Sequence, residues 1–247
     1  MKTAIIIPAR YSSKRFPGKP LKKILGKEML IRVIEKCLNA ISRKKIFVAT
    51  DNKKIFNFVK NNKYNALMTP KTCKTGTDRV YLASKQIPAK IFINVQGDEP
   101  LVKSSDIKKI IKAKKKFKNH VICGYAPISS KENPNNKNIP KVLLNHKGEL
   151  MYISRLPIPA SKIPNRSFQS FNKQVCIYAF NKRELKMFYS FGKKSKVEKS
   201  EDIEMIRFLE LNVPIKMIKL SKGSIAVDVI SDIKKVEKSL KKNERKN

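Results

Sequence analysis

The chain has 247 residues, of which 41% are hydrophobic, and a formal net charge of +37; this length and content predict a folded protein with a sizeable core and exclude a disordered segment. No apolar run approaches the roughly 18 residues of a membrane span, and Pro8 and Arg10 follow the first apolar run where a signal peptide would continue. We therefore expect a cytoplasmic protein without membrane insertion.

The first half of the chain alternates strand-like and helix-like segments. Apolar β-branched runs predict strands at 4–9, 44–51, 65–69 and within 90–101, and amphipathic spacing predicts helices at 29–41, 52–62, 77–87 and 104–117. Thr77 or Asp78 would cap the third of these helices. The alternation predicts an α/β fold with a mostly parallel sheet flanked by helices and with ligands at the carboxyl ends of its strands.

From about residue 121 the regular alternation of strand-like and helix-like segments gives way to strand-rich segments. Strands are expected at 121–128, at 141–154 with a turn at 146–148, and at 173–180, followed by helices at 181–191 and 199–211, a strand at 214–220 and a terminal helix at 231–243. We expect a single α/β domain over residues 1–247, in which a strand-rich sub-region, about 121–180, packs as an insertion beside the main sheet.

The loop after the first expected strand is basic and is shaped by proline and glycine. It holds Arg10, Lys14, Arg15 and Lys19 around the Pro17–Gly18 pair, which bends the chain so that Lys19 points back towards the strand end. Such a loop at the carboxyl end of a buried strand suits a polyphosphate, and arginine holds phosphate oxygens bidentately.

Two acidic residues are candidate metal ligands. Asp98 follows the fourth expected strand beside Gly97, which permits close backbone approach, and Asp228 ends the apolar run SIAV, which we expect to be a strand. Carboxylates in such positions suit Mg²⁺, which binds through one or two carboxylates plus substrate phosphates. Asp51 could serve in the same way, although an aspartate closing a strand is more often a helix cap.

Several common kinds of site are disfavoured. The basic loop is not GxxxxGK[ST] and no GxGxxG follows the first strand, which argues against P-loop and dinucleotide-binding enzymes. Four widely spaced cysteines and two histidines suggest neither a zinc site nor a histidine triad. Lysines occur in almost every segment rather than on one face with aromatic residues, so we expect no dedicated nucleic-acid partner; a basic RNA-binding α/β protein is kept as an alternative.

Eight segments resemble, in order, the motifs of CMP-KDO synthetases, the 3-deoxy-manno-octulosonate cytidylyltransferases. They are PARYSSKRFPGKPL, VATDN, TGTDR, NVQGDEPL, YISRLPIP, IYAF, EDIEMIRFLE and AVDVISDI, between residue 4 and about residue 236. The resemblance implies a Rossmann-like, nucleotide-diphospho-sugar transferase-like fold. It also implies a reaction in which CTP and the acidic eight-carbon sugar KDO give CMP-KDO and pyrophosphate for lipopolysaccharide biosynthesis.

The same resemblance implies roles for individual residues. Arg15, Lys19 and Asp98 would be catalytic, and Asp98 and Asp228 would bind Mg²⁺. The sugar would contact Arg79, Gln96, Arg155, Gln174, Tyr178 and Glu204. The nucleotide would contact Arg10, Ser13, Arg15, Lys19, Thr77 and Asp78. In the family the strand-rich part around YISRLPIP also contributes to a homodimer interface, and we expect a homodimer on that ground.

Departures from the family pattern concentrate at the expected sugar end. Gln174 stands where the family usually has histidine, Cys176 where it has glycine, and Met205 where it has glutamine. The nucleotide and metal motifs are intact by comparison. The alternative is therefore the same chemistry on a related acidic sugar, such as an amino-KDO or another ulosonic acid.

Overall fold

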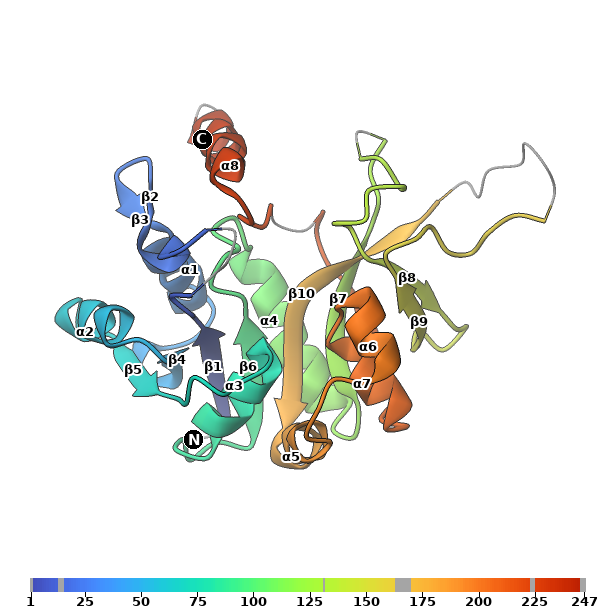
Figure 1. Ribbon diagram of the computed structural model, residues 1–247, viewed down its shortest axis with the longest axis horizontal. Coiled ribbons are helices and arrows are strands. Elements are labelled where there is room, and N and C mark those ends of the chain that lie inside the picture. The colour runs from blue at the N-terminus through green and yellow to red at the C-terminus, as the bar shows by residue number, and fades with distance from the viewer. Residues whose placement is uncertain (1, 13–15, 131, 163–169, 223–224, 245–247) are drawn as a thin grey trace.

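The computed structural model describes residues 2–12, 16–130, 132–162, 170–222 and 225–244. Within these ranges nine strands form one mixed sheet, whose central order is β11-β7-β10-β6-β1-β4-β5 (Figure 1). The strands are β1 (Thr3–Pro8), β4 (Ile46–Thr50), β5 (Asn65–Met68), β6 (Ile91–Val95), β7 (Val121–Pro127), β8 (Lys141–Leu144), β9 (Leu150–Ser154), β10 (Asn172–Asn181) and β11 (Ile215–Lys219). A separate small hairpin pairs β2 (Lys23–Ile24) with β3 (Lys27–Glu28).

Helices cover both faces of the sheet. They are α1 (Met29–Leu38), α2 (Lys53–Asn61), α3 (Gly76–Ser84), α4 (Ser104–Lys116), α5 (Lys182–Ser190), α6 (Lys196–Glu201), α7 (Met205–Glu210) and α8 (Ile230–Glu244), with short 3-10 turns η1 (Lys19–Leu21) and η2 (Arg43–Lys45). Among the residues described, no helix combines the length and apolar character that crossing a membrane requires.

The two faces of β1 show why the protein has three layers. Successive side chains of a strand point to opposite faces, and here Ile5 and Ile7 join a buried cluster with α1, α2 and α4. Ala4 and Ile6 join a second cluster on the other face with α3, α5 and α7. A largely apolar strand that is buried on both sides is thus the centre of an α/β/α sandwich.

The pairing confirms the expectation of a mostly parallel sheet flanked by helices. β1 pairs in parallel with β4 and β6, β4 with β5, and β7 with β11, whereas β10 runs antiparallel to both β6 and β7. We expected the strand-rich part to pack beside the main sheet, but much of it lies within that sheet. β7 and β10 are internal strands, because β7 pairs with β11 and β10, and β10 pairs with β7 and β6; only the β8–β9 hairpin extends from β10.

Three local expectations also differ from the structure. The helix expected at 199–211 is divided into α6 and α7 by Asp202, whose φ of 49° is left-handed and ends the first helix. Helix α3 is capped by Thr75 rather than by Thr77 or Asp78, because Thr75 and Asp78 form a reciprocal capping box. We expected a strand to end at Asp228, but residues 225–227, just before it, do not form one.

Candidate active site

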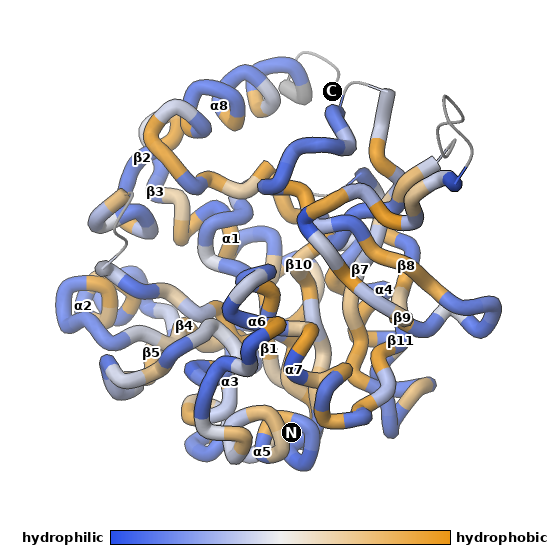
Figure 2. Tube along the Cα trace, turned by 45° about the vertical axis from the view of Figure 1, so that its right-hand side comes forward, coloured by the Kyte–Doolittle hydropathy of each residue, from blue (hydrophilic) through white to orange (hydrophobic). Residues whose placement is uncertain are grey.

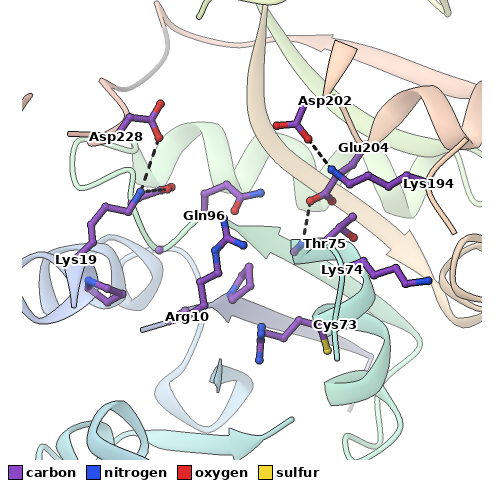
Figure 3. Close-up of a pocket in the computed structure, with 17 residues that line it drawn as sticks. Arg10, Lys19, Cys73, Lys74, Thr75, Gln96, Lys194, Asp202, Glu204 and Asp228 are labelled. Atoms are coloured by element: carbon purple, nitrogen blue, oxygen red, sulfur yellow. Dashed lines mark hydrogen bonds and ion pairs between the residues drawn. The ribbon is translucent and has the colours of Figure 1, made fainter. Parts of the chain in front are cut away.

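A cavity of about 800 Å³ lies where β1 and β6 end (Figure 3). Residues after both strands line it, including Arg10 and Asp98, so the cavity lies at the carboxyl ends of strands, where we expected ligands. Asp51, which follows β4, takes part indirectly: its Oδ2 lies 2.8 Å from Nη2 of Arg79, a lining residue. The full lining is Pro8, Ala9, Arg10, Lys19, Pro20, Cys73, Lys74, Thr75, Gly76, Arg79, Gln96, Gly97, Asp98, Lys194, Asp202, Glu204 and Asp228.

Gly97 allows the two strand ends to approach each other. A Cβ atom at this position would lie 2.9 Å from the carbonyl oxygen of Pro8, closer than real Cβ contacts occur. The absence of a side chain therefore brings Asp98 next to the loop that begins after β1. This is the close backbone approach that the QGDEP segment predicted.

The ammonium of Lys19 lies between the two acidic candidates. Its Nζ is 2.7 Å from Oδ2 of Asp98, 3.9 Å from Oδ1 of Asp228, and 2.7 Å from the carbonyl oxygen of Val227. Gly18, with a left-handed φ of 68°, precedes Lys19 and begins the η1 turn. The bend expected at Pro17–Gly18 thus directs Lys19 into the cavity.

Asp228 reaches this place from a segment that is not part of the sheet. The backbone N–H of Val227 donates to the carbonyl of Asp98 at 2.9 Å, which ties the two acidic segments together. Asp232 then accepts the N–H groups of Asp228 and Val229 at 3.0 and 3.1 Å, at the start of α8. The convergence of Asp98 and Asp228 was predicted, but a loop contact rather than a strand end produces it.

The donor set at this side of the cavity fits Mg²⁺. Asp98 and Asp228 offer hard carboxylate oxygens, and a cation of the chain itself already lies between them. No cluster of three or more His, Cys, Asp or Glu side chains suited to a metal occurs in the described ranges. Burial, together with the charges of Asp98 and Asp228, raises the pKa of the adjacent Glu99 to about 8. A metal here would complete its shell with substrate oxygens and water.

On the other side of the cavity, Glu204 holds the start of α3. Its Oε1 accepts the N–H of Gly76 at 2.8 Å, and its Oε2 accepts the N–H of Thr77 at 3.0 Å and the Thr77 hydroxyl. Burial raises the pKa of Glu204, and these hydrogen bonds oppose the rise. The amide groups that could receive a phosphate at this helix start are therefore used by the protein's own carboxylate.

Thr77 and Asp78, for which we expected nucleotide contacts, have buried side chains that do not line the cavity. The Thr77 hydroxyl bonds Glu204, and the Asp78 carboxylate accepts the N–H of Thr75 at 2.9 Å and lies 3.4 Å from Nη1 of Arg207. Both side chains hold TGTDR in place by internal contacts. Two further expected nucleotide ligands, Ser13 and Arg15, lie outside the described residues.

The residues expected at the sugar fall into two groups. Arg79, Gln96 and Glu204 line the cavity, whereas Arg155, Gln174 and Tyr178 do not. The Arg155 guanidinium donates to backbone carbonyls, that of Lys137 at 2.7 Å, that of Asp202 at 3.1 Å and that of Glu201. Nε2 of Gln174 donates to the Tyr178 hydroxyl at 3.2 Å, and Tyr178 is buried.

Sequence reasoning missed the wall formed by Lys194 and Asp202. Nζ of Lys194 lies 2.5 Å from Oδ1 of Asp202, and both residues line the cavity, opposite Lys19 and Asp228 in Figure 3. Lys74 also lines it and donates to the carbonyl of Gly192. These lysines stand in stretches as lysine-rich as any other part of the chain, so local composition offered no signal for them.

An open α/β sheet with a cavity at the carboxyl ends of parallel strands, lined by basic residues and paired carboxylates, defines the class of nucleotide-binding α/β enzymes. A family model described as cytidylyltransferase matches residues 4–218, and the chain belongs to this family.

Named relatives extend the likeness over almost the whole chain. A 3-deoxy-manno-octulosonate cytidylyltransferase of Desulfosudis oleivorans is 36% identical, with 96% of each chain covered. The same enzyme of Porphyromonas gingivalis is 34% identical, with 93% of each covered. A solved CMP:2-keto-3-deoxy-manno-octonic acid synthetase complexed with CTP superposes with a TM-score of 0.90 at 30% identity, covering 98% of this chain and 100% of its own. These findings confirm the resemblance and the fold it implied.

Proposed function

We propose that this chain is a Mg²⁺-dependent cytidylyltransferase that joins CTP to KDO and releases pyrophosphate. The observation that carries the proposal is the meeting of Lys19, Asp98 and Asp228 on one side of a cavity of about 800 Å³. A cation, two carboxylates and room for two substrates suit phosphoryl chemistry between anions. The names of relatives at 34% and 36% identity supply the sugar.

The reaction brings two negatively charged molecules together. The anomeric hydroxyl of the sugar attacks the α-phosphorus, a new P–O bond forms, and the bond to the bridging oxygen breaks as pyrophosphate leaves. Catalysis then depends on neutralisation and in-line positioning rather than on a covalent enzyme intermediate. Arg10 and Lys19, which line the cavity beside the end of β1, would hold the phosphates.

Asp98 and Asp228 would hold the metal. A Mg²⁺ ion held there would supply charge neutralisation at the α-phosphate and would lower the pKa of the attacking hydroxyl. The two carboxylates are kept adjacent by the Val227–Asp98 backbone hydrogen bond of 2.9 Å.

The sugar would occupy the side of the cavity formed by Gln96, Lys194, Asp202 and Glu204. Arg155, through its bonds to the carbonyls of Glu201 and Asp202, would support this wall rather than bind the sugar directly. Gln174 and Met205 would influence the sugar only indirectly, by packing behind this side of the cavity. Met205 is fully buried, and Gln174 donates a hydrogen bond to Tyr178.

Asp202 gives the alternative substrate a physical basis. Its carboxylate is 69% exposed and lines the cavity. A carboxylate at this place would pair with the ammonium of an amino-sugar as readily as it would accept a hydroxyl of KDO. We therefore keep an amino-KDO or another ulosonic acid as the second candidate.

Pyrophosphate release from CTP and Mg²⁺, measured with KDO and a panel of related acids, tests both candidates. We expect turnover with KDO, and Asp98→Asn should lower it at least about a hundredfold because a metal-binding carboxylate is lost. Glu35→Gln on α1, which removes one partner of an exposed ion pair with Lys27 of β3, should leave turnover unchanged. Faster turnover of an amino-KDO would select the alternative, and absence of turnover with every acid would reject the proposal.

A further inference from the structure

The position of Lys19 implies more than a role in phosphate binding. Its side chain is 12% exposed, and its ammonium donates to Asp98 and to the Val227 carbonyl, both at 2.7 Å. In Figure 3 the Lys19 side chain extends towards Asp228, and a dashed line joins the two. Both carboxylates assigned to the metal are therefore in contact with, or within 4 Å of, a cation that belongs to the chain.

We propose that Lys19 is a built-in counter-cation of the Asp98–Asp228 pair in the metal-free protein, which a divalent cation must displace in order to bind. The inference rests on the proposed function, which places the metal at this pair. It adds a competition between a side chain and the metal for the same oxygens.

The pair needs a positive charge whenever the metal is absent. The Val227–Asp98 backbone bond of 2.9 Å keeps the two acidic segments adjacent, and both carboxylates lie within 4 Å of the same ammonium. Asp98 is 32% exposed and Asp228 42% exposed, so solvent screens their mutual repulsion only in part. The ammonium of Lys19 offsets this repulsion and satisfies one Asp98 oxygen.

The ammonium and a divalent cation would compete for the same carboxylates. A metal bound to the same carboxylate would add two positive charges next to an ammonium that lies 2.7 Å from Oδ2 of Asp98. Repulsion between the cations would therefore expel the lysine, which has a flexible four-carbon stem and rises from the short η1 turn.

A polyphosphate in the cavity would give the displaced ammonium new anionic partners. Release of Lys19 from Asp98 would then be favoured by the nucleotide and by the metal together. Each ligand should therefore strengthen the binding of the other, as linkage requires. The same lysine would prevent tight metal binding before the nucleotide arrives.

Calorimetric titration with Mn²⁺, without CTP or sugar, tests the competition. Lys19→Met removes the charge at nearly constant volume and should tighten Mn²⁺ binding about tenfold or more. Lys19→Gln is a second uncharged variant in case the first does not fold. Lys19→Arg keeps the charge and should bind Mn²⁺ within about twofold of the parent protein.

Two controls fix the place of the effect. Lys23→Met removes an exposed lysine of β2, 65% exposed and 4.0 Å from Glu28, and should leave Mn²⁺ affinity unchanged. Asp98→Asn added to Lys19→Met should abolish the tightening. Unchanged or weaker binding in folded Lys19→Met and Lys19→Gln, or tightening that survives Asp98→Asn, would overturn the competition.

The outcome is separable from the function itself, because the titration contains neither substrate. A protein that turns over CTP and KDO but shows no tightening in Lys19→Met keeps the proposed function and rejects the competition. A protein that shows tighter Mn²⁺ binding in Lys19→Met but no turnover with any acid keeps the competition and rejects the proposed function.

Discussion

At the scale of single residues, Arg207 joins two segments of the motif pattern that are far apart in sequence. Its guanidinium pairs with both carboxylate oxygens of Glu198 at 2.7 Å, lies 3.4 Å from Asp78, and stacks over the ring of Phe188. Arg207 and Glu198 are fully buried. TGTDR and EDIEMIR are thus coupled by one side chain, so Asp78 has a structural role that needs no direct contact with a ligand.

Removing this guanidinium should destabilise the protein strongly. Arg207→Leu leaves the buried Glu198 carboxylate without its bidentate partner, and we expect the free energy of unfolding in urea to fall by about 3–5 kcal/mol. The double variant Arg207→Leu, Glu198→Leu removes both charges and should recover part of the loss. A double variant no more stable than the single one would mean that the ion pair is not what makes Arg207 necessary.

At the scale of elements, helix α8 anchors the segment that carries Asp228. A small separate core contains Phe16, Ile24, Met29, Val227 and Val236, so it connects the basic loop, β2, α1, the Asp228 segment and α8. Figures 1 and 2 both show α8 beside β2 and β3, and in Figure 2 orange hydrophobic stretches alternate with blue along it. Loss of this packing would loosen one wall of the proposed metal site.

A cavity in this small core should raise the Mg²⁺ requirement. Val236→Ala is expected to cost about 2 kcal/mol of stability and, by loosening α8, to raise several-fold the Mg²⁺ concentration needed for half-maximal pyrophosphate release. Val59→Ala, at an equally buried valine of α2 in another core cluster, is the matched control. An equal Mg²⁺ requirement in the two variants would separate α8 from the metal site.

At the scale of the whole molecule, the β8–β9 hairpin and the residues after it present apolar side chains. Met151 is 56% exposed, Tyr152 39% and Leu156 60%. We propose that a second copy of the chain covers this region, in the dimer that the family resemblance implied. Exposed apolar groups gathered on one hairpin are typical of a protein interface.

Light scattering measures the assembly directly. The parent protein should have twice the chain mass of 28.3 kDa, and Leu156→Glu should shift it to the monomer because a buried unpaired charge opposes association. Met68→Glu, at an exposed residue of β5, should not change the mass. A monomeric parent protein, or a Leu156→Glu variant that is still a dimer, would contradict the proposed interface.

Much of the fold could be predicted because its signals are local. Strand and helix periodicities located most elements of the first half to within a few residues, and the glycine of QGDEP indicated the close approach of β6 to β1. The break at Asp202 was not predictable, because a left-handed residue inside an amphipathic run leaves the hydrophobic period unchanged. The place of β10 between β6 and β7 depends on pairings between distant segments.

The sequence by itself determined the buried strands, the basic loop and the two acidic segments, because apolar periodicity and the turn chemistry of glycine and proline act over a few neighbouring residues. Among 56 lysines and arginines, the sequence indicated Arg10 and Lys19, and only the tertiary structure showed what Lys19 contacts and that Lys194 lines the same cavity. Lys19 contacts a carbonyl 208 residues away in sequence, and Lys194 and Asp202, which flank α6, line the cavity as an ion pair. The tertiary structure also showed that Thr77 and Asp78 are buried and bond other residues of the protein, because a polar side chain removed from water needs partners inside the protein.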